Sequence, residues 1–276
     1  MTDAITRLRS GVDVRMFVRP RWKRLARREG LRLRAGARDL SRPCLLTVAA
    51  LSLTLGCSVL FLLAPGLDLA VSAAFHQPGA GFPLAADDAL RALRRSSTWV
   101  MGSVLVAVLI AAFGRREWTA GWGEGRRRRG LCLLAAFALG PGLLVNGLLK
   151  GVWGRARPVN VVEFGGDDPF TAAWKFSDGC LSNCSFTSGE ASSAAWTVIA
   201  ALALMPRSWR PVGGTAILIY GLALSLNRVA FGGHFLSDVV LSWLLTLLTA
   251  ILVGRLMRTA PGALPVRGSV RGLAAA

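Results

Sequence analysis

The segment FLSDVVLSWLLTLLTAILVG, residues 235–254, decides the fold class of this chain. It carries a single charged residue, Asp238, and an apolar segment of about 20 residues is long enough to cross the hydrocarbon core of a bilayer as a helix. The whole chain has 276 residues, of which 53% are hydrophobic, and is more apolar than one soluble core requires. The segment therefore predicts a membrane-spanning helix.

Further apolar runs of similar length precede this segment, and we expect each of them to form a span. They lie near residues 44–64, 97–113, 131–149, 189–205 and 212–230. The predicted fold is therefore all-α, a polytopic membrane protein with about six transmembrane helices. The expected domain organisation is a basic tail at 1–42, a membrane domain at 43–256 and a short tail at 257–276.

The chain is strongly basic, with 33 Lys and Arg against 15 Asp and Glu and a formal net charge of +18. In a soluble protein this excess would indicate a nucleic acid partner. Here most of the cations fall in the two tails and in the predicted loops 114–130 and 205–211, all on one side of the six-span arrangement. This pattern follows the positive-inside rule, so it predicts cytoplasmic termini and argues against nucleic acid binding.

Two segments outside the spans also have patterns that indicate structure. The basic tail 1–42 is compatible either with a helix lying on the membrane surface or with disorder. The segment PLAADDALRALRR, residues 83–95, has apolar residues at helical spacing, which predicts a short interfacial helix on the outer face. The first apolar run starts too late in the chain for a cleavable signal peptide.

Ionisable residues gather where three predicted spans meet the outer face, and such residues are the strongest functional indicators in a membrane sequence. The long outer segment 151–186 connects two of these spans and is expected to be a functional loop. The candidate residues are Lys150, Arg155 and Arg157 after the third span, Ser188, Gly189 and Glu190 at the start of the fourth, and Arg228, His234 and Asp238 between the last two.

Lys150, Arg157 and Arg228 would be costly to desolvate without an anion, so they indicate a bound ligand of about two negative charges, such as a phosphate monoester. Ser188 and Gly189 stand where free N–H groups of a helix start form an anion site. His234 and Asp238 are four residues apart and share one face of a helix, so the carboxylate can orient the imidazole for attack on phosphorus.

Each residue also has a purely structural interpretation. Lys150 and Arg155 can be end residues whose heads reach the interface, and Arg228 an anchor of the same kind. Ser188 can be only a helix cap, Glu190 a favourable first-turn acid, and His234 with Asp238 a structural pair. Their convergence on one face favours the functional interpretation.

The three segments together resemble the type 2 phosphatidic acid phosphatase superfamily. Its pattern is a Lys, six residues and Arg-Pro, then Pro-Ser-Gly-His, then Ser-Arg, five residues, His, three residues and Asp. KGVWGRARP at 150–158, SG at 188–189 and the spacing of Arg228, His234 and Asp238 match it. The resemblance covers residues 95–255. It implies a phosphate bound by Lys150, Arg157, Ser188, Gly189 and Arg228, a nucleophilic His234 oriented by Asp238, and no metal or other cofactor.

Two positions depart from the superfamily pattern. Asn227 precedes Arg228 in place of Ser, and Thr187-Ser-Gly-Glu190 replaces Pro-Ser-Gly-His. In the superfamily the second His is expected to protonate the leaving oxygen. A carboxyl group in a poorly hydrated site can serve as a general acid, although neighbouring cations oppose this. Glu190 is therefore expected either to be the acid or to bind an amine or hydroxyl of the substrate.

GRARP followed by SFTSGE is similar to bacterial phosphatases of this superfamily that remove phosphate from lipid A at the outer face of the inner membrane. The resemblance implies a phosphorylated membrane lipid as substrate, with lipid A favoured, and a site facing the periplasm. Phosphatidylglycerophosphate, phosphatidic acid and undecaprenyl diphosphate stay open as substrates. A lipid phosphotransferase or a non-catalytic lipid-binding or transport protein is the alternative, although no paired broken spans indicate a transporter.

Five cysteines fall into two groups. Cys44, Cys57 and Cys132 lie in or near predicted spans. Cys180 and Cys184 lie in the predicted outer loop, where an oxidising compartment permits a disulfide. A bridge across so short a loop and a pair of free thiols are equally compatible with the sequence.

Overall fold

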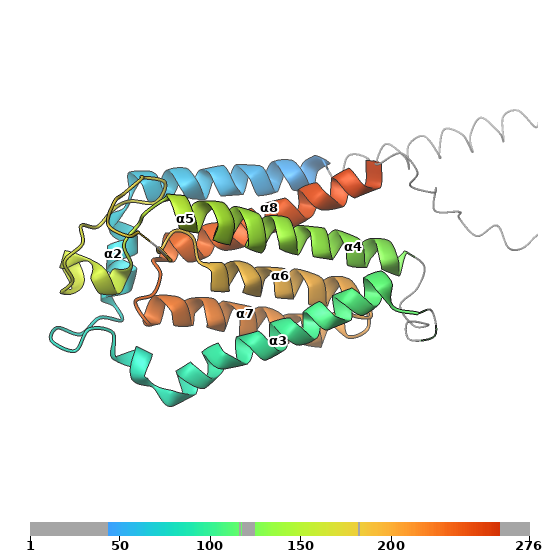
Figure 1. Cartoon of the computed structure of the whole chain (residues 1–276), viewed down its shortest axis with the longest axis horizontal. Coiled ribbons are helices and arrows are strands. Elements are labelled where there is room, and N and C mark those ends of the chain that lie inside the picture. The colour runs from blue at the N-terminus through green and yellow to red at the C-terminus, as the bar shows by residue number, and fades with distance from the viewer. Residues whose placement is uncertain (1–43, 116, 118–124, 182, 260–276) are drawn as a thin grey trace, which may run out of the picture. The chain divides into compact units, whose positions relative to one another are not determined.

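The computed structural model describes residues 44–115, 117, 125–181 and 183–259. Within these residues the regular structure is helical, apart from two isolated β-bridges. The all-α prediction is confirmed (Figure 1). The predicted basic tail 1–42 and most of the predicted tail 257–276 lie outside the described residues.

The helices long and apolar enough to cross a membrane number five within this part of the chain. They are Cys44–Leu63, α3 (Asp88–Phe113), Arg126–Val152, α7 (Arg210–Ala230) and α8 (Leu236–Thr259). The predicted fourth span is α6 (Gly189–Leu204), an apolar helix of only 16 residues. The chain is thus a polytopic helical protein, with a fourth helix shorter than a full span.

The short helix α6 occupies the interior of the bundle. It contacts α3, α4, α7 and α8, and most of its residues are buried (Figure 1). A helix surrounded by other helices does not need to match the thickness of the lipid, because its ends can face protein or water. Its N-terminus therefore begins inside the bundle, where its free N–H groups can face a ligand.

The helix α3 begins earlier than the sequence predicted. A short 3₁₀ turn, η2 (Pro83–Ala86), is followed directly by α3, whose first N–H groups are capped by Asp87 through a 2.8 Å bond to the Leu90 N–H. The separate interfacial helix predicted over 83–95 is therefore wrong, because residues 83–86 form η2 and residues 88–95 form the first turns of α3. This brings Arg91, Arg94 and Arg95 onto a long helix that packs on α6.

The span Arg126–Val152 changes its winding part-way along. It consists of α4 (Arg126–Phe137), a π-helical segment η4 (Ala138–Leu149) and α5 (Lys150–Val152). Pro141 lies inside η4 and has no N–H, and the Asn146 side chain donates a 2.7 Å hydrogen bond to its carbonyl. Local π winding and polar side chains can satisfy backbone groups around a proline within a span.

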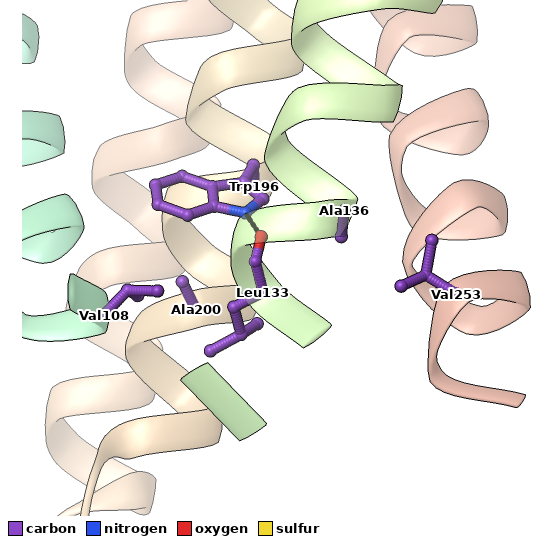
Figure 2. Close-up of a cluster of buried hydrophobic side chains, with 6 residues drawn as sticks. All are labelled: Val108, Leu133, Ala136, Trp196, Ala200 and Val253. Carbon is purple, nitrogen blue, oxygen red and sulfur yellow. Dashed lines mark hydrogen bonds between the residues drawn. The ribbon is translucent and has the colours of Figure 1, made fainter. Parts of the chain in front are cut away.

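The core lies between α3, α4, α6 and α8. Figure 2 shows Trp196 of α6 among Val108, Leu133, Ala136, Ala200 and Val253, all buried. The indole N–H of Trp196 donates a 2.9 Å hydrogen bond to the Leu133 carbonyl (Figure 2). A buried indole needs a partner for this N–H group, so the bond fixes α6 against α4 as well as filling the core.

The segment between Val152 and α6 is irregular, with two 3₁₀ turns, η5 (Pro158–Asn160) and η6 (Val162–Phe164). A disulfide joins Cys180 and Cys184, so the paired alternative holds in this structure. This segment and the short helix α2 (Gly66–Ala73) lie at the end of the bundle where α6 begins (Figure 1).

Candidate active site

The N-terminus of α6 is capped by the side chain of Ser188, the residue before the helix. Ser188 accepts a hydrogen bond from the Ala191 N–H at 3.3 Å, and both Ser188 and Gly189 are buried. A Cβ on Gly189 would overlap the side-chain amide of Asn146, so glycine at this position allows α6 and η4 to approach each other closely. The cap interpretation of Ser188 and its place at an anion site are compatible, because the remaining N–H groups of the first turn stay available.

Three cations from separate elements surround this helix start. Lys150 begins α5 near the end of the third span, Arg157 follows in the loop and Arg228 lies in the last turn of α7. The structure brings all three close enough for their charges to act on the His234 imidazole. Lys150 has no ion-pair partner among the described residues, which leaves its charge available for an anion.

His234 is buried, with 2% of its surface exposed. Its Nδ1 atom lies 2.8 Å from the Ser185 carbonyl, which can only accept, so Nδ1 carries the proton and Nε2 holds the free electron pair. Burial lowers the pKa of His234 well below its ordinary value, and the charges of Arg228 and Arg157 lower it further. The site therefore holds a neutral imidazole, the form that can act as a nucleophile.

Asp238 is fully buried beside this histidine, but its strongest contacts are elsewhere. Its Oδ2 atom is 3.9 Å from His234 Nδ1, beyond hydrogen-bonding distance. Oδ2 instead accepts hydrogen bonds from the Ser185 hydroxyl at 2.6 Å and the Phe235 N–H at 2.8 Å. In this structure Asp238 reaches the imidazole indirectly, by holding the residue whose carbonyl binds Nδ1.

Asp238 belongs to a buried ion-pair network with Arg155 and Asp68. Arg155 donates to Asp238 Oδ1 at 2.7 Å and to Asp68 of α2 at 2.8 Å, and all three side chains are fully buried. Asp68 also accepts from the backbone N–H and the hydroxyl of Ser237. Arg155 is thus not an end residue reaching for the interface, and the sequence alone did not identify Asp68 as part of the site.

Gly233, which precedes His234, lies against the side chain of Arg228. A Cβ on Gly233 would overlap the guanidinium of Arg228. The Gly233 N–H also donates a 3.0 Å hydrogen bond to the Arg228 carbonyl. The turn between α7 and α8 therefore fixes the distance between Arg228 and His234.

Comparison of the sequence with known proteins identifies the family of this chain. The sequence profile of the PAP2 superfamily matches residues 129–261. A lipid A 4′-phosphatase from Rhizobium leguminosarum is 36% identical over 185 residues, which is 66% of this chain and 78% of that protein. The chain belongs to the PAP2 superfamily.

Two further relatives are also lipid A 4′-phosphatases. A lipid A 4′-phosphatase from Rhizobium etli is 38% identical over 190 residues, covering 66% of this chain and 71% of the relative. One from Francisella tularensis subsp. novicida is 40% identical over 119 residues, covering 43% of this chain and 54% of the relative. No solved structure matches the chain significantly.

The principal departure from the PAP2 motif, Glu190, lies between two arginines. Arg94 of α3 makes three hydrogen bonds to its carboxylate, the shortest 2.7 Å, and Arg228 Nε lies 3.3 Å from its second oxygen. Arg94 was missed at the sequence level, because nothing in the local pattern of α3 indicates a contact 96 residues away. In this structure Glu190 is thus an ion-pair partner of both arginines.

Two further positions that differ from the PAP2 pattern, Asn227 and Thr187, are also buried in this structure. Asn227 donates a 3.0 Å hydrogen bond to the Leu90 carbonyl and so links α7 to the first turns of α3. Thr187 is buried, and its hydroxyl has no hydrogen-bond partner in the part of the chain that the structure describes. Among the same residues no group of three or more His, Cys, Asp and Glu is placed to hold a metal ion.

Proposed function

We propose that this protein is a lipid phosphatase that hydrolyses a phosphate monoester of lipid A through a phosphohistidine at His234. The observation that carries the proposal is a buried His234 whose Nδ1 is bound to the Ser185 carbonyl, which leaves Nε2 free, close to three cations at the start of α6. The lipid A 4′-phosphatase relatives support the substrate class.

The proposed reaction begins when Lys150, Arg157 and Arg228 bind the phosphate dianion. The N–H groups at the start of α6 contribute further hydrogen bonds to its oxygens. Nε2 of His234 then attacks phosphorus, and the bond to the sugar oxygen breaks. Fixed cations stabilise the charge spread over the transferring phosphoryl group. Water afterwards hydrolyses the phosphohistidine, which releases phosphate and restores the free imidazole.

Glu190 is proposed to protonate the leaving oxygen. A bound phosphate dianion would compete with the carboxylate for Arg228 and would place a like charge beside it. Both changes would weaken the ion pair between Glu190 and Arg228 that this structure shows. The alternative is that Glu190 only aligns Arg94 and Arg228, in which case its substitution affects all substrates alike.

The proposed location is the bacterial inner membrane, with both termini in the cytoplasm and the site facing the periplasm. The proposal rests on Arg115, which follows α3, and on the four arginines 126–129 that open α4, at the end of the bundle opposite the starts of α6 and α8 (Figure 1). The positive-inside rule assigns that end to the cytoplasm. A disulfide between Cys180 and Cys184 at the His234 end is compatible with the oxidising periplasm.

The test is phosphate release from a panel of lipids by the purified protein in detergent with EDTA. The panel contains lipid A, phosphatidylglycerophosphate, phosphatidic acid and undecaprenyl diphosphate, each also incubated with His234→Ala. We expect release from lipid A that is lost in the variant. Release from another lipid would reassign the substrate, and binding without release would indicate a non-catalytic lipid-binding protein.

A further inference from the structure

A cavity of about 540 Å³ opens beside the catalytic residues, between α3, η4, α6 and α7. Lys150, Gly189 and Glu190 form part of its wall. A lipid whose phosphate reaches His234 can therefore extend into this cavity. Its other polar wall is formed by three arginines from the first turns of α3, namely Arg91, Arg94 and Arg95.

The three arginines differ in their partners. Arg94 is paired with Glu190, and Arg91 is paired at 2.7 Å with Asp88, whose side chain is 93% exposed. Arg95 has no ion-pair partner among the described residues. Glu190 is the acidic residue of the cavity lining, so the lining carries a clear excess of positive charge. Such an excess attracts an anionic ligand.

Arg91 and Arg95 are separate from the cations that would hold the reacting phosphate. Arg94 pairs with Glu190, which also pairs with Arg228, whereas Arg91 pairs with Asp88 and neither Arg91 nor Arg95 pairs with Glu190 in the described part of the chain. Arg91 and Arg95 are four residues apart and therefore lie on one face of α3. The Arg94–Glu190 pair thus stands between two positively charged regions.

The rest of the cavity is suited to the boundary between a polar headgroup and lipid chains. Apolar side chains that include Met101, Val198 and Leu224 line it together with the hydroxyl-bearing residues Ser193, Thr197 and Tyr220. Ligand sites commonly combine an apolar wall with a few polar groups that fix orientation. The occupant that matches both features is an amphipathic molecule with an anionic group near Arg91 and Arg95.

We propose that Arg91 and Arg95 form a second anion subsite, which binds a further phosphate or carboxylate on the same lipid whose phosphate is attacked by His234. This inference rests on the proposed function. It makes the enzyme selective for lipids with two anionic groups, because the second group anchors the substrate in the cavity beside the catalytic cations.

The test measures binding in detergent micelles by protein that carries His234→Ala and therefore cannot turn over. The probes are a disaccharide lipid with two phosphates and the same lipid with only the phosphate that is hydrolysed. We expect the first to bind about tenfold more tightly. Arg95→Gln and Arg91→Gln should each weaken its binding by about threefold to fivefold without affecting the second, as for an exposed charge pair.

Two control variants separate the possible outcomes. Arg157→Gln should weaken both lipids alike, and Lys175→Gln, in the loop at the same end of the bundle but outside the cavity lining, should weaken neither. Equal affinity for the two lipids, unchanged by Arg95→Gln, would overturn the subsite and leave the proposed function intact. No binding of either lipid would overturn both.

Discussion

The guanidinium of Arg155 donates a hydrogen bond to Asp238 across 2.7 Å, and neither side chain is exposed to solvent. The same guanidinium binds Asp68 at 2.8 Å. One buried cation is therefore the counter-charge shared by two buried carboxylates, and the arrangement joins α2, the loop after the third span and the start of α8. His234 depends on this network because Asp238 holds Ser185, whose carbonyl binds the imidazole.

Replacing this cation should strongly destabilise the protein. Arg155→Met leaves Asp68 and Asp238 buried without a counter-charge, and breaking a buried pair in this way costs about 3–5 kcal/mol. We expect a large fall in the free energy of unfolding, measured by denaturant titration in detergent micelles. Arg91→Met breaks an exposed pair and should cost under about 1 kcal/mol. Equal stability of the two variants would contradict the network's role.

A single methyl group on Gly233 should impair catalysis without unfolding the protein. In Gly233→Ala the new Cβ displaces the guanidinium of Arg228, which is the flexible end of a side chain and can move aside. Loss of one charge-assisted contact to the transferring phosphate is worth roughly tenfold to a hundredfold in kcat/KM. Gly56→Ala is the matched control, because nothing surrounds that position. Full activity of Gly233→Ala would show that catalysis does not require the Arg228 guanidinium in the position that this structure gives it.

The pH dependence of kcat/KM should report the lowered pKa of His234. Burial, Arg228 and Arg157 all lower this pKa, so the imidazole stays neutral at mildly acidic pH and loses activity only when more acid protonates it. In Arg157→Gln one of these influences is removed, and the acid limb should move to higher pH. The same lipid is used for both proteins, so that ionisation of the substrate cancels. Identical acid limbs for the two proteins would show that the charge of Arg157 does not affect the pKa of His234.

The role of Glu190 can be resolved by varying the leaving group. If Glu190 supplies a proton, Glu190→Gln should lower turnover of a sugar phosphate about a hundredfold, the usual range for general acid catalysis. It should affect an aryl phosphate much less, because a phenolate with a low pKa leaves without help. If Glu190 only aligns Arg94 and Arg228, the two substrates should lose activity by the same factor.

Much of the site followed from the sequence because it is built from residues next to span ends. Lys150, Arg157, Arg228 and His234 each lie near the end of an apolar run, and helices that cross the same membrane must bring such ends to one face. The structure places these four close together, as expected. The lengths of the apolar runs likewise predicted the spans, except that α6 is short because protein surrounds it.

The residues that the sequence did not reveal act through distant contacts. Asp68 pairs with Arg155 across 87 positions and Arg94 with Glu190 across 96, and neither acid nor arginine differs locally from an ordinary surface charge. Asp238 was expected to bind the imidazole because it lies four positions after His234. Instead Ser185 provides the carbonyl, and no periodic pattern marks a loop residue for such a role.

The central claim is most directly tested by trapping the covalent intermediate. The protein is mixed with lipid A labelled in its phosphate, quenched with alkali within the first turnover, digested and examined by mass spectrometry. A phosphohistidine is stable to alkali and labile to acid, so the account predicts a phosphoryl group at His234 that is absent in His234→Ala. Phosphate release at the same rate with no label on His234 would contradict the account, because it would mean that water attacks the lipid phosphate directly.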